Sequence, residues 1–172
     1  ADAKGKNEKV LTPEMVTLIA ERKLKIPLRQ AAGDEAQQLL NLEKTIHEKL
    51  IDQDEAVKAV SRALREYRAG LSKKGGPIAA FLFVGPTGVG KTELSKILTA
   101  IQFGSKEKMI RFDMSEYQDK QSFFRFIGSP DGRISGQLTE AVKISPYSLI
   151  LLDEFEKAHP DILNLFLQVF DE

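Results

Sequence analysis

A glycine-rich loop at residues 85–92 constrains this chain more than any other feature. It matches the phosphate-binding pattern G-x-x-x-x-G-K-[ST] in full. Glycines let the backbone curl so that successive N–H groups point at phosphate oxygens, and a helix that follows offers its positive dipole end to the same anion. The loop consists of Gly85, Pro86, Thr87, Gly88, Val89, Gly90, Lys91 and Thr92.

The surroundings of the loop favour a nucleotide site over an incidental turn. Residues 79–84 are apolar without alternation, as expected of a strand covered on both faces in a parallel sheet. Leu94, Ile97, Leu98 and Ile101 then give one apolar stripe of a helix. In this context Lys91 is expected to bind the β- and γ-phosphates, and Thr92 to be a Mg²⁺ ligand.

A second acidic motif completes the predicted site. Asp153 and Glu154 follow the apolar residues 149–152 directly. Because a carboxylate that leaves a buried strand needs compensation, Asp153 is assigned to Mg²⁺, and Glu154 is the candidate general base for the attacking water. Alone, the pair could merely cap the next helix. A GTPase would carry a guanine-reading Asn-Lys-x-Asp segment, and a small-molecule kinase would not need Glu154, so ATP hydrolysis fits best.

The rest of the chain predicts an α/β fold with a helical N-terminal flank. Helices are expected to start at Thr12-Pro13 and at Asp34, and another to carry Val57, Val60 and Leu64, with residues 25–28 extended. After the loop, residues 109–112 and 148–152 are predicted strands, and Pro160 begins a final helix.

Composition excludes several classes of protein. Lys plus Arg and Asp plus Glu both total 25, so no global charge attracts nucleic acid or an anionic membrane. Cysteine is absent, and the longest apolar run, residues 78–84, is far shorter than the roughly 18 residues that span a bilayer. A soluble, cytoplasmic protein without nucleic-acid or membrane partners is therefore expected.

Three other features carry less information. His47 and His159 are isolated, and structural roles are expected for both. Residues 113–117 follow the second predicted strand, where they could form either a polar network beside the nucleotide or a helix-capping turn. Phe123, Phe124 and Phe126 are expected in the core or in a subunit contact. A platform for stacking nucleic-acid bases is less expected, because no cluster of basic residues surrounds the three aromatics.

Four blocks of sequence resemble a known family. Residues 85–92, 113–117, 136–142 and 151–160 are similar, in order and with few gaps, to the second ATPase module of Clp and heat-shock-100 AAA+ proteins. The resemblance implies a P-loop NTPase (AAA+) three-layer sandwich with a mostly parallel sheet, incomplete at the C-terminus. It also implies a linker with a short helix at residues 1–34 and the nucleotide-binding large subdomain at 35–172.

The same resemblance implies a function. It is that of a hexameric ring of identical subunits that hydrolyses ATP with Mg²⁺ and threads protein substrates, either as a disaggregase or for a Clp-type peptidase. Hydrolysis is expected in the complete assembly, with this chain alone weak or inactive. Leu50 and Ile51, together with Ile26-Pro27, fall where the family contacts adenine.

Three departures from the family qualify this reading. Asp52 stands where the family has glycine, and residues 133–135 offer no aromatic at the expected pore loop. The chain stops at Glu172, before the family's sensor asparagine, arginine finger and lid. A non-hydrolysing assembly module, or a DNA-remodelling AAA+ protein, remains as an alternative. No strand of residues 1–172 is expected between residues 79–84 and 148–152, because the family's intervening strand comes later.

Overall fold

The computed structural model describes residues 12–24, 37–69, 71 and 77–171. Two strands, β1 (Met109–Asp113) and β2 (Leu149–Asp153), pair in parallel, with Asp113 opposite Asp153 and Arg111 opposite Leu151. Both strands were predicted within one residue of these bounds. Two further predictions, the extended residues 25–28 and a helix start at Asp34, lie outside the described residues.

The described residues between 12 and 69 are mostly helical, and the 3.6-residue periodicity of this region predicts helices there. α1 (Pro13–Leu24) begins where the Thr12 Oγ1 accepts a 3.4 Å hydrogen bond from the Met15 amide. α3 (Leu42–His47) and α4 (Asp54–Arg68) follow, and α5 (Lys91–Phe103) begins at the end of the glycine-rich loop. α5 ends at Gly104, whose φ of 77° is in the left-handed region that favours glycine.

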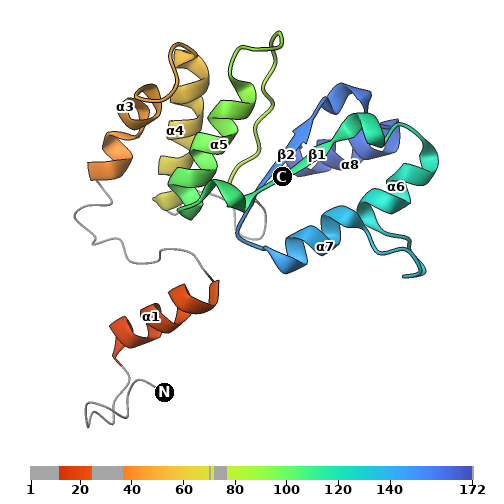
Figure 1. Cartoon of the computed structure of the whole chain (residues 1–172), viewed down its shortest axis with the longest axis horizontal. Helices are drawn as coiled ribbons and strands as arrows, with labels where there is room; N and C mark the ends of the chain where they lie inside the picture. Colours follow the sequence, from red (N-terminus) through yellow and green to blue (C-terminus); the bar gives the residue numbers. More distant parts are fainter. Residues whose placement is uncertain (1–11, 25–36, 70, 72–76, 172) are drawn as a thin grey trace.

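Two apolar clusters lie on different sides of the strand pair (Figure 1). The first joins α3, α4 and α5, and it includes Leu149 at its edge. The second surrounds Phe126 and contains Phe112 and Leu152. Since alternate strand residues point to opposite faces, Arg111 and Asp153 share the face of Leu149, towards α5.

The second cluster is built by the C-terminal helices. α6 (Lys120–Ile127) and α8 (Pro160–Asp171) contribute Phe126, Ile162 and Phe166, and α7 (Gln137–Ile144) contributes Leu138. Three short 3₁₀ helices lie between the longer elements of this half, namely η2 (Lys106–Lys108), η3 (Met114–Glu116) and η4 (Phe155–Lys157). No helix among the described residues is both long and apolar enough to cross a membrane.

The predicted strand at residues 79–84 is wrong. These residues form no strand, and the side chains of Leu82 and Val84 are 65% and 87% exposed. The rings of Phe81 and Phe83 lie parallel, with centroids 6.1 Å apart. A strand exists only through hydrogen bonds to a neighbour, and no described residue forms a strand between this segment and β2.

Candidate functional site: a phosphate-binding loop beside two carboxylates

The glycine-rich loop has a backbone that only glycine adopts readily. Gly88 and Gly90 have φ angles of 83° and 94°, and Gly90 directly precedes α5. A Cβ on Gly90 would lie 3.0 Å from the Leu50 Cδ1, so the loop also packs closely on the chain before α4. The amide N–H groups of Gly88, Gly90 and Lys91 donate to no described protein atom. Such free donors at a helix N-terminus fit an anion.

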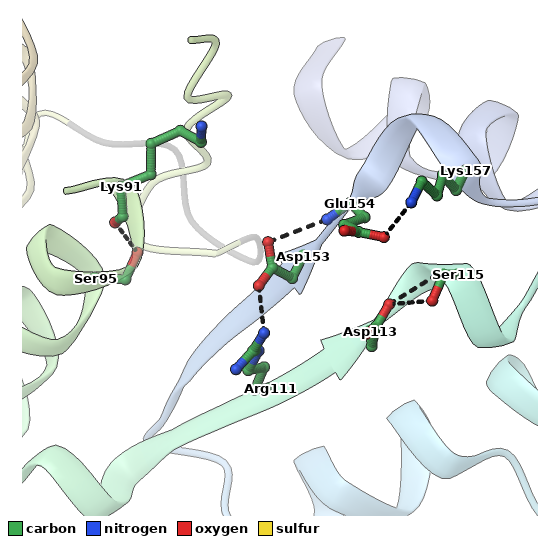
Figure 2. A network of polar contacts seen from close by, with 8 residues as sticks. All are labelled: Lys91, Ser95, Arg111, Asp113, Ser115, Asp153, Glu154 and Lys157. Carbon is green, nitrogen blue, oxygen red and sulfur yellow. Dashed lines mark hydrogen bonds and ion pairs between the residues drawn. The ribbon is translucent and has the colours of Figure 1, made fainter. Parts of the chain in front are cut away.

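Lys91 is bound to its own loop. Its Nζ donates to the carbonyl oxygens of Gly85 and Pro86, at 2.6 and 2.7 Å. Figure 2 draws no contact between this ammonium group and Asp153. Two carbonyl dipoles are weaker partners for an ammonium than phosphate charges are, so this arrangement holds the cation at the loop without neutralising it.

A pocket of about 390 Å³ joins the loop to the predicted adenine segment. This volume is within the roughly 300–1,000 Å³ that is usual for small-ligand sites. Val89, Gly90 and Lys91 line one part of it, and Leu50 and Phe81 line another. Of the two described residues predicted to contact adenine, Leu50 therefore lies in the pocket, whereas Ile51 is 86% exposed and is not part of the lining. Ile26-Pro27 lies outside the described residues.

The turn after Leu50 explains one departure from the family. Asp52 and Gln53 have φ angles of 66° and 65°, which L-residues with a side chain rarely adopt. Asp52 stands where the resembling sequences have glycine, and the backbone at that position suits glycine. Aspartate tolerates this region better than most residues, because its short side chain bonds locally. The loop between Leu50 and α4 therefore carries local strain.

The two candidate carboxylates lie at the C-terminal end of β2 (Figure 2). Asp153 accepts a 2.6 Å hydrogen bond on Oδ2 from the Arg111 Nη2, and a 3.2 Å bond on Oδ1 from the Glu154 amide. Glu154 has a φ of 53° and accepts a 2.6 Å bond on Oε2 from the Lys157 Nζ. Each carboxylate thus has a cationic partner of its own, and sequence reasoning identified neither cation.

The C-terminal end of β1 carries another carboxylate, Asp113. Its Oδ1 accepts from the Ser115 hydroxyl at 2.6 Å and from the Ser115 amide at 3.0 Å. These bonds hold the pKa of the Asp113 carboxyl below its ordinary value, with smaller help from the Arg111 and Lys157 charges. The Glu154 carboxylate in turn raises the pKa of Lys157. Of the two readings left open for residues 113–117, a capping turn is present, since Asp113 caps η3.

The histidines and phenylalanines have structural surroundings. The His47 Nδ1 lies 3.3 Å from the Leu50 carbonyl oxygen, and the His159 Nδ1 accepts from the Asp161 amide. Phe126 is fully buried, at the centre of the second cluster. These positions agree with the structural roles expected from the sequence.

The short loop expected at the pore position is a closed turn. Gly128 and Ser135 form an isolated antiparallel bridge, and the Asp131 carboxylate pairs with the Arg133 Nε at 3.2 Å. A Cβ on Gly136 would lie 2.1 Å from the Ile127 carbonyl carbon, so this position admits only glycine without a backbone shift. Ile134, at 48% exposure, is the apolar side chain that the turn presents.

Comparison with known proteins places these features in one family. A model of the AAA domain (Cdc48 subfamily) matches residues 76–172. The chain is 52% identical to the chaperone protein ClpC2, chloroplastic, of Arabidopsis thaliana. The 151 aligned residues are 86% of this chain and 16% of that protein.

Two proteins of Lactococcus lactis subsp. lactis are similar over longer stretches. The ATP-dependent Clp protease ATP-binding subunit ClpE is 51% identical, covering 95% of this chain and 22% of that protein. The chaperone protein ClpB is 49% identical, covering 94% and 19%. The chain therefore spans less than a quarter of the length of these relatives.

Proposed function

We propose that this chain, which belongs to the AAA domain family (Cdc48 subfamily), is the nucleotide-binding core of a Clp-type ATPase. The observation that carries the proposal is the pocket shared by Leu50 and Lys91, at the N-terminus of α5. α5 packs on the strand pair, whose face towards it carries Asp153. In this arrangement, adenine and the phosphates would bind on the side of the sheet that carries Asp153 at the end of β2.

Each residue has a role that its surroundings support. The free N–H groups of Gly88, Gly90 and Lys91 would bind phosphate oxygens. The Lys91 ammonium would leave its two loop carbonyls for the β- and γ-phosphates. The Thr92 hydroxyl and the Asp153 carboxylate would hold Mg²⁺, directly or through water, which supplies charge neutralisation on the phosphates. Glu154 would accept the proton of the attacking water.

The complete fold and the domain limits belong to the same proposal. A strand beside residues 79–84 would make this segment part of a mostly parallel sheet, covered by helices on both faces as in a three-layer P-loop NTPase sandwich. The parallel pairing of β1 and β2 and the two apolar clusters support this arrangement. We place the nucleotide-binding subdomain at residues 35–172 and a linker with a short helix at 1–34.

We further propose that the complete protein is cytoplasmic and remodels protein substrates as a hexameric ring, either as a disaggregase or as the partner of a peptidase. The names of the relatives, which are chaperones and an ATP-binding subunit of a protease, support protein substrates and a Clp partner. The turn at residues 128–136 presents Ile134 and no aromatic side chain. Contact with a substrate at this turn would therefore be aliphatic.

Phosphate release from ATP, measured in the complete assembly, tests the proposal. Glu154→Gln is expected to keep Mg²⁺–ATP binding and to lose about 10²-fold or more in hydrolysis, the scale of a general base. Asp153→Asn should instead impair the Mg²⁺-dependent steps. Glu156→Gln removes a neighbouring exposed carboxylate and serves as the matched control. Normal hydrolysis by Glu154→Gln would place the base elsewhere.

A further inference from the structure

The ion pair between Arg111 and Asp153 joins two neighbouring strands at the acidic end of the site. Arg111 lies opposite Leu151, so Asp153 is two residues further along β2 and on the same face. The Arg111 Nη2 and the Asp153 Oδ2 are 2.6 Å apart, with the side chains 55% and 29% exposed. The cation that Asp153 contacts in this structure therefore comes from the adjacent strand.

The two hydrogen bonds on Asp153 fix the direction of its carboxylate. Arg111 binds Oδ2, and the Glu154 amide binds Oδ1 from the opposite end of the group. A carboxylate can accept about four hydrogen bonds in all, so both oxygens keep lone pairs for a further ligand. Arg111 orients Asp153 without closing it to Mg²⁺.

The charges around Asp153 give Arg111 a second effect. Asp113, Asp153 and Glu154 bring three carboxylates to the ends of β1 and β2, and Arg111 and Lys157 are the cations paired with Asp153 and Glu154. ATP adds further negative charge beside them. Without a divalent cation, an uncompensated Asp153 would repel the phosphates, and Arg111 reduces that repulsion.

We infer that Arg111 is a positioning residue and resident counter-ion for Asp153, which orients the carboxylate for Mg²⁺ and lets nucleotide bind before the metal does. The inference rests on the proposed nucleotide site and extends it to a residue outside the loop and the acidic motif. A purely structural ion pair would only join β1 to β2, which five register pairs already hold together. The two roles differ in their dependence on Mg²⁺.

Calorimetric titration of the full chain with ATP, in excess Mg²⁺ and in excess chelator, separates the two roles. Arg111→Met is expected to weaken Mg²⁺-free binding about fivefold and Mg²⁺–ATP binding much less, since an exposed pair contributes up to ~1 kcal/mol. Arg111→Lys should restore most of the Mg²⁺-free affinity, because it keeps the charge. Arg62→Met, which removes an arginine from an exposed pair with Glu66 on α4, should change neither affinity.

The double variant with Arg111→Met and Asp153→Asn separates an effect through Asp153 from a general effect of Arg111→Met on folding. Because Arg111 acts through Asp153, Arg111→Met should have little effect on Mg²⁺-free binding when Asp153→Asn is already present. Equal losses with and without Mg²⁺, or the same loss in the Asp153→Asn background, would overturn the inference while leaving ATP binding established. Failure of the unmodified chain to bind Mg²⁺–ATP would overturn the proposed function as well.

Discussion

Asp113 and Ser115 are joined by two hydrogen bonds to a single carboxylate oxygen. The Ser115 hydroxyl lies 2.6 Å and the Ser115 amide 3.0 Å from the Asp113 Oδ1. The hydroxyl bond is the largest cause of the lowered pKa of Asp113, and the amide bond comes next. Both bonds are stronger when the carboxylate is ionised, so their contribution to stability depends on pH.

The sign of that dependence follows from the direction of the shift. A carboxyl whose pKa is lower in the folded state stabilises the fold above its unfolded pKa of about 3.9, and this stabilisation is lost as the pH falls through the folded value. Ser115→Ala should therefore unfold more easily than the unmodified chain at pH 7, with a smaller difference at acid pH. Urea unfolding at both pH values measures this.

Ser105→Ala is the control for that measurement. The Ser105 hydroxyl caps η2 by accepting from the Glu107 amide, without a carboxylate acceptor. The effect of Ser105→Ala should not follow the titration of Asp113. A Ser115→Ala difference that stays constant from neutral to acid pH would contradict the assignment.

Replacement of Asp52 by glycine should stabilise the chain. Asp52 has a φ of 66°, and glycine adopts this region without the steric cost that a Cβ brings. We expect Asp52→Gly to raise the free energy of unfolding by ~0.5–1 kcal/mol. This is less than the roughly 1–2 kcal/mol usual for a residue in the left-handed region, because aspartate already tolerates the conformation. Asp52→Ala removes the charge but keeps the Cβ, and it should give no such gain.

The buried hydroxyl of Ser61 offers a second stability test. Ser61 is fully buried on α4, and its Oγ has no hydrogen-bond partner among the described residues. Ser61→Ala should be neutral or stabilising by up to ~1 kcal/mol, since it removes an unsatisfied polar group. Ser122 is equally buried, but its hydroxyl donates to the Asp119 carbonyl oxygen, so Ser122→Ala should cost ~1 kcal/mol. Thermal or urea unfolding of the Ser61→Ala and Ser122→Ala variants measures both changes in stability. A loss of stability in Ser61→Ala would contradict the expectation.

Local sequence predicted the elements whose stability is local. The apolar stripes of α4 and α5 were recognised from helical spacing, and residues 109–112 and 148–152 were predicted as strands close to the observed bounds of β1 and β2. The wrong prediction at residues 79–84 has a physical cause. An apolar run favours a buried strand, but a segment becomes a strand only when its backbone forms hydrogen bonds with a neighbouring strand. In the described structure, the side chains of Leu82 and Val84 are exposed.

For the same reason, contiguous sequence motifs indicate only part of the candidate site. The loop and the Asp153–Glu154 pair are contiguous motifs, whereas the contact of Arg111 with Asp153 depends on the strand register. The contact of Lys157 with Glu154 depends on the turn into η4, which the motif does not specify. Asp52 was recognised as a departure, but only the backbone angle gives the physical reason for glycine there.

The central claim is that residues 85–92 bind the phosphates of ATP, with Lys91 as their principal cation. Calorimetric titration with Mg²⁺ and ATP tests it most directly. Lys91→Ala should weaken binding sharply, because the backbone N–H groups alone leave much of the triphosphate charge uncompensated. Lys96→Ala, which removes a half-exposed lysine paired with Glu93 on the same helix, should bind as the unmodified chain does. Equal affinities of the Lys91→Ala and Lys96→Ala variants would contradict the account.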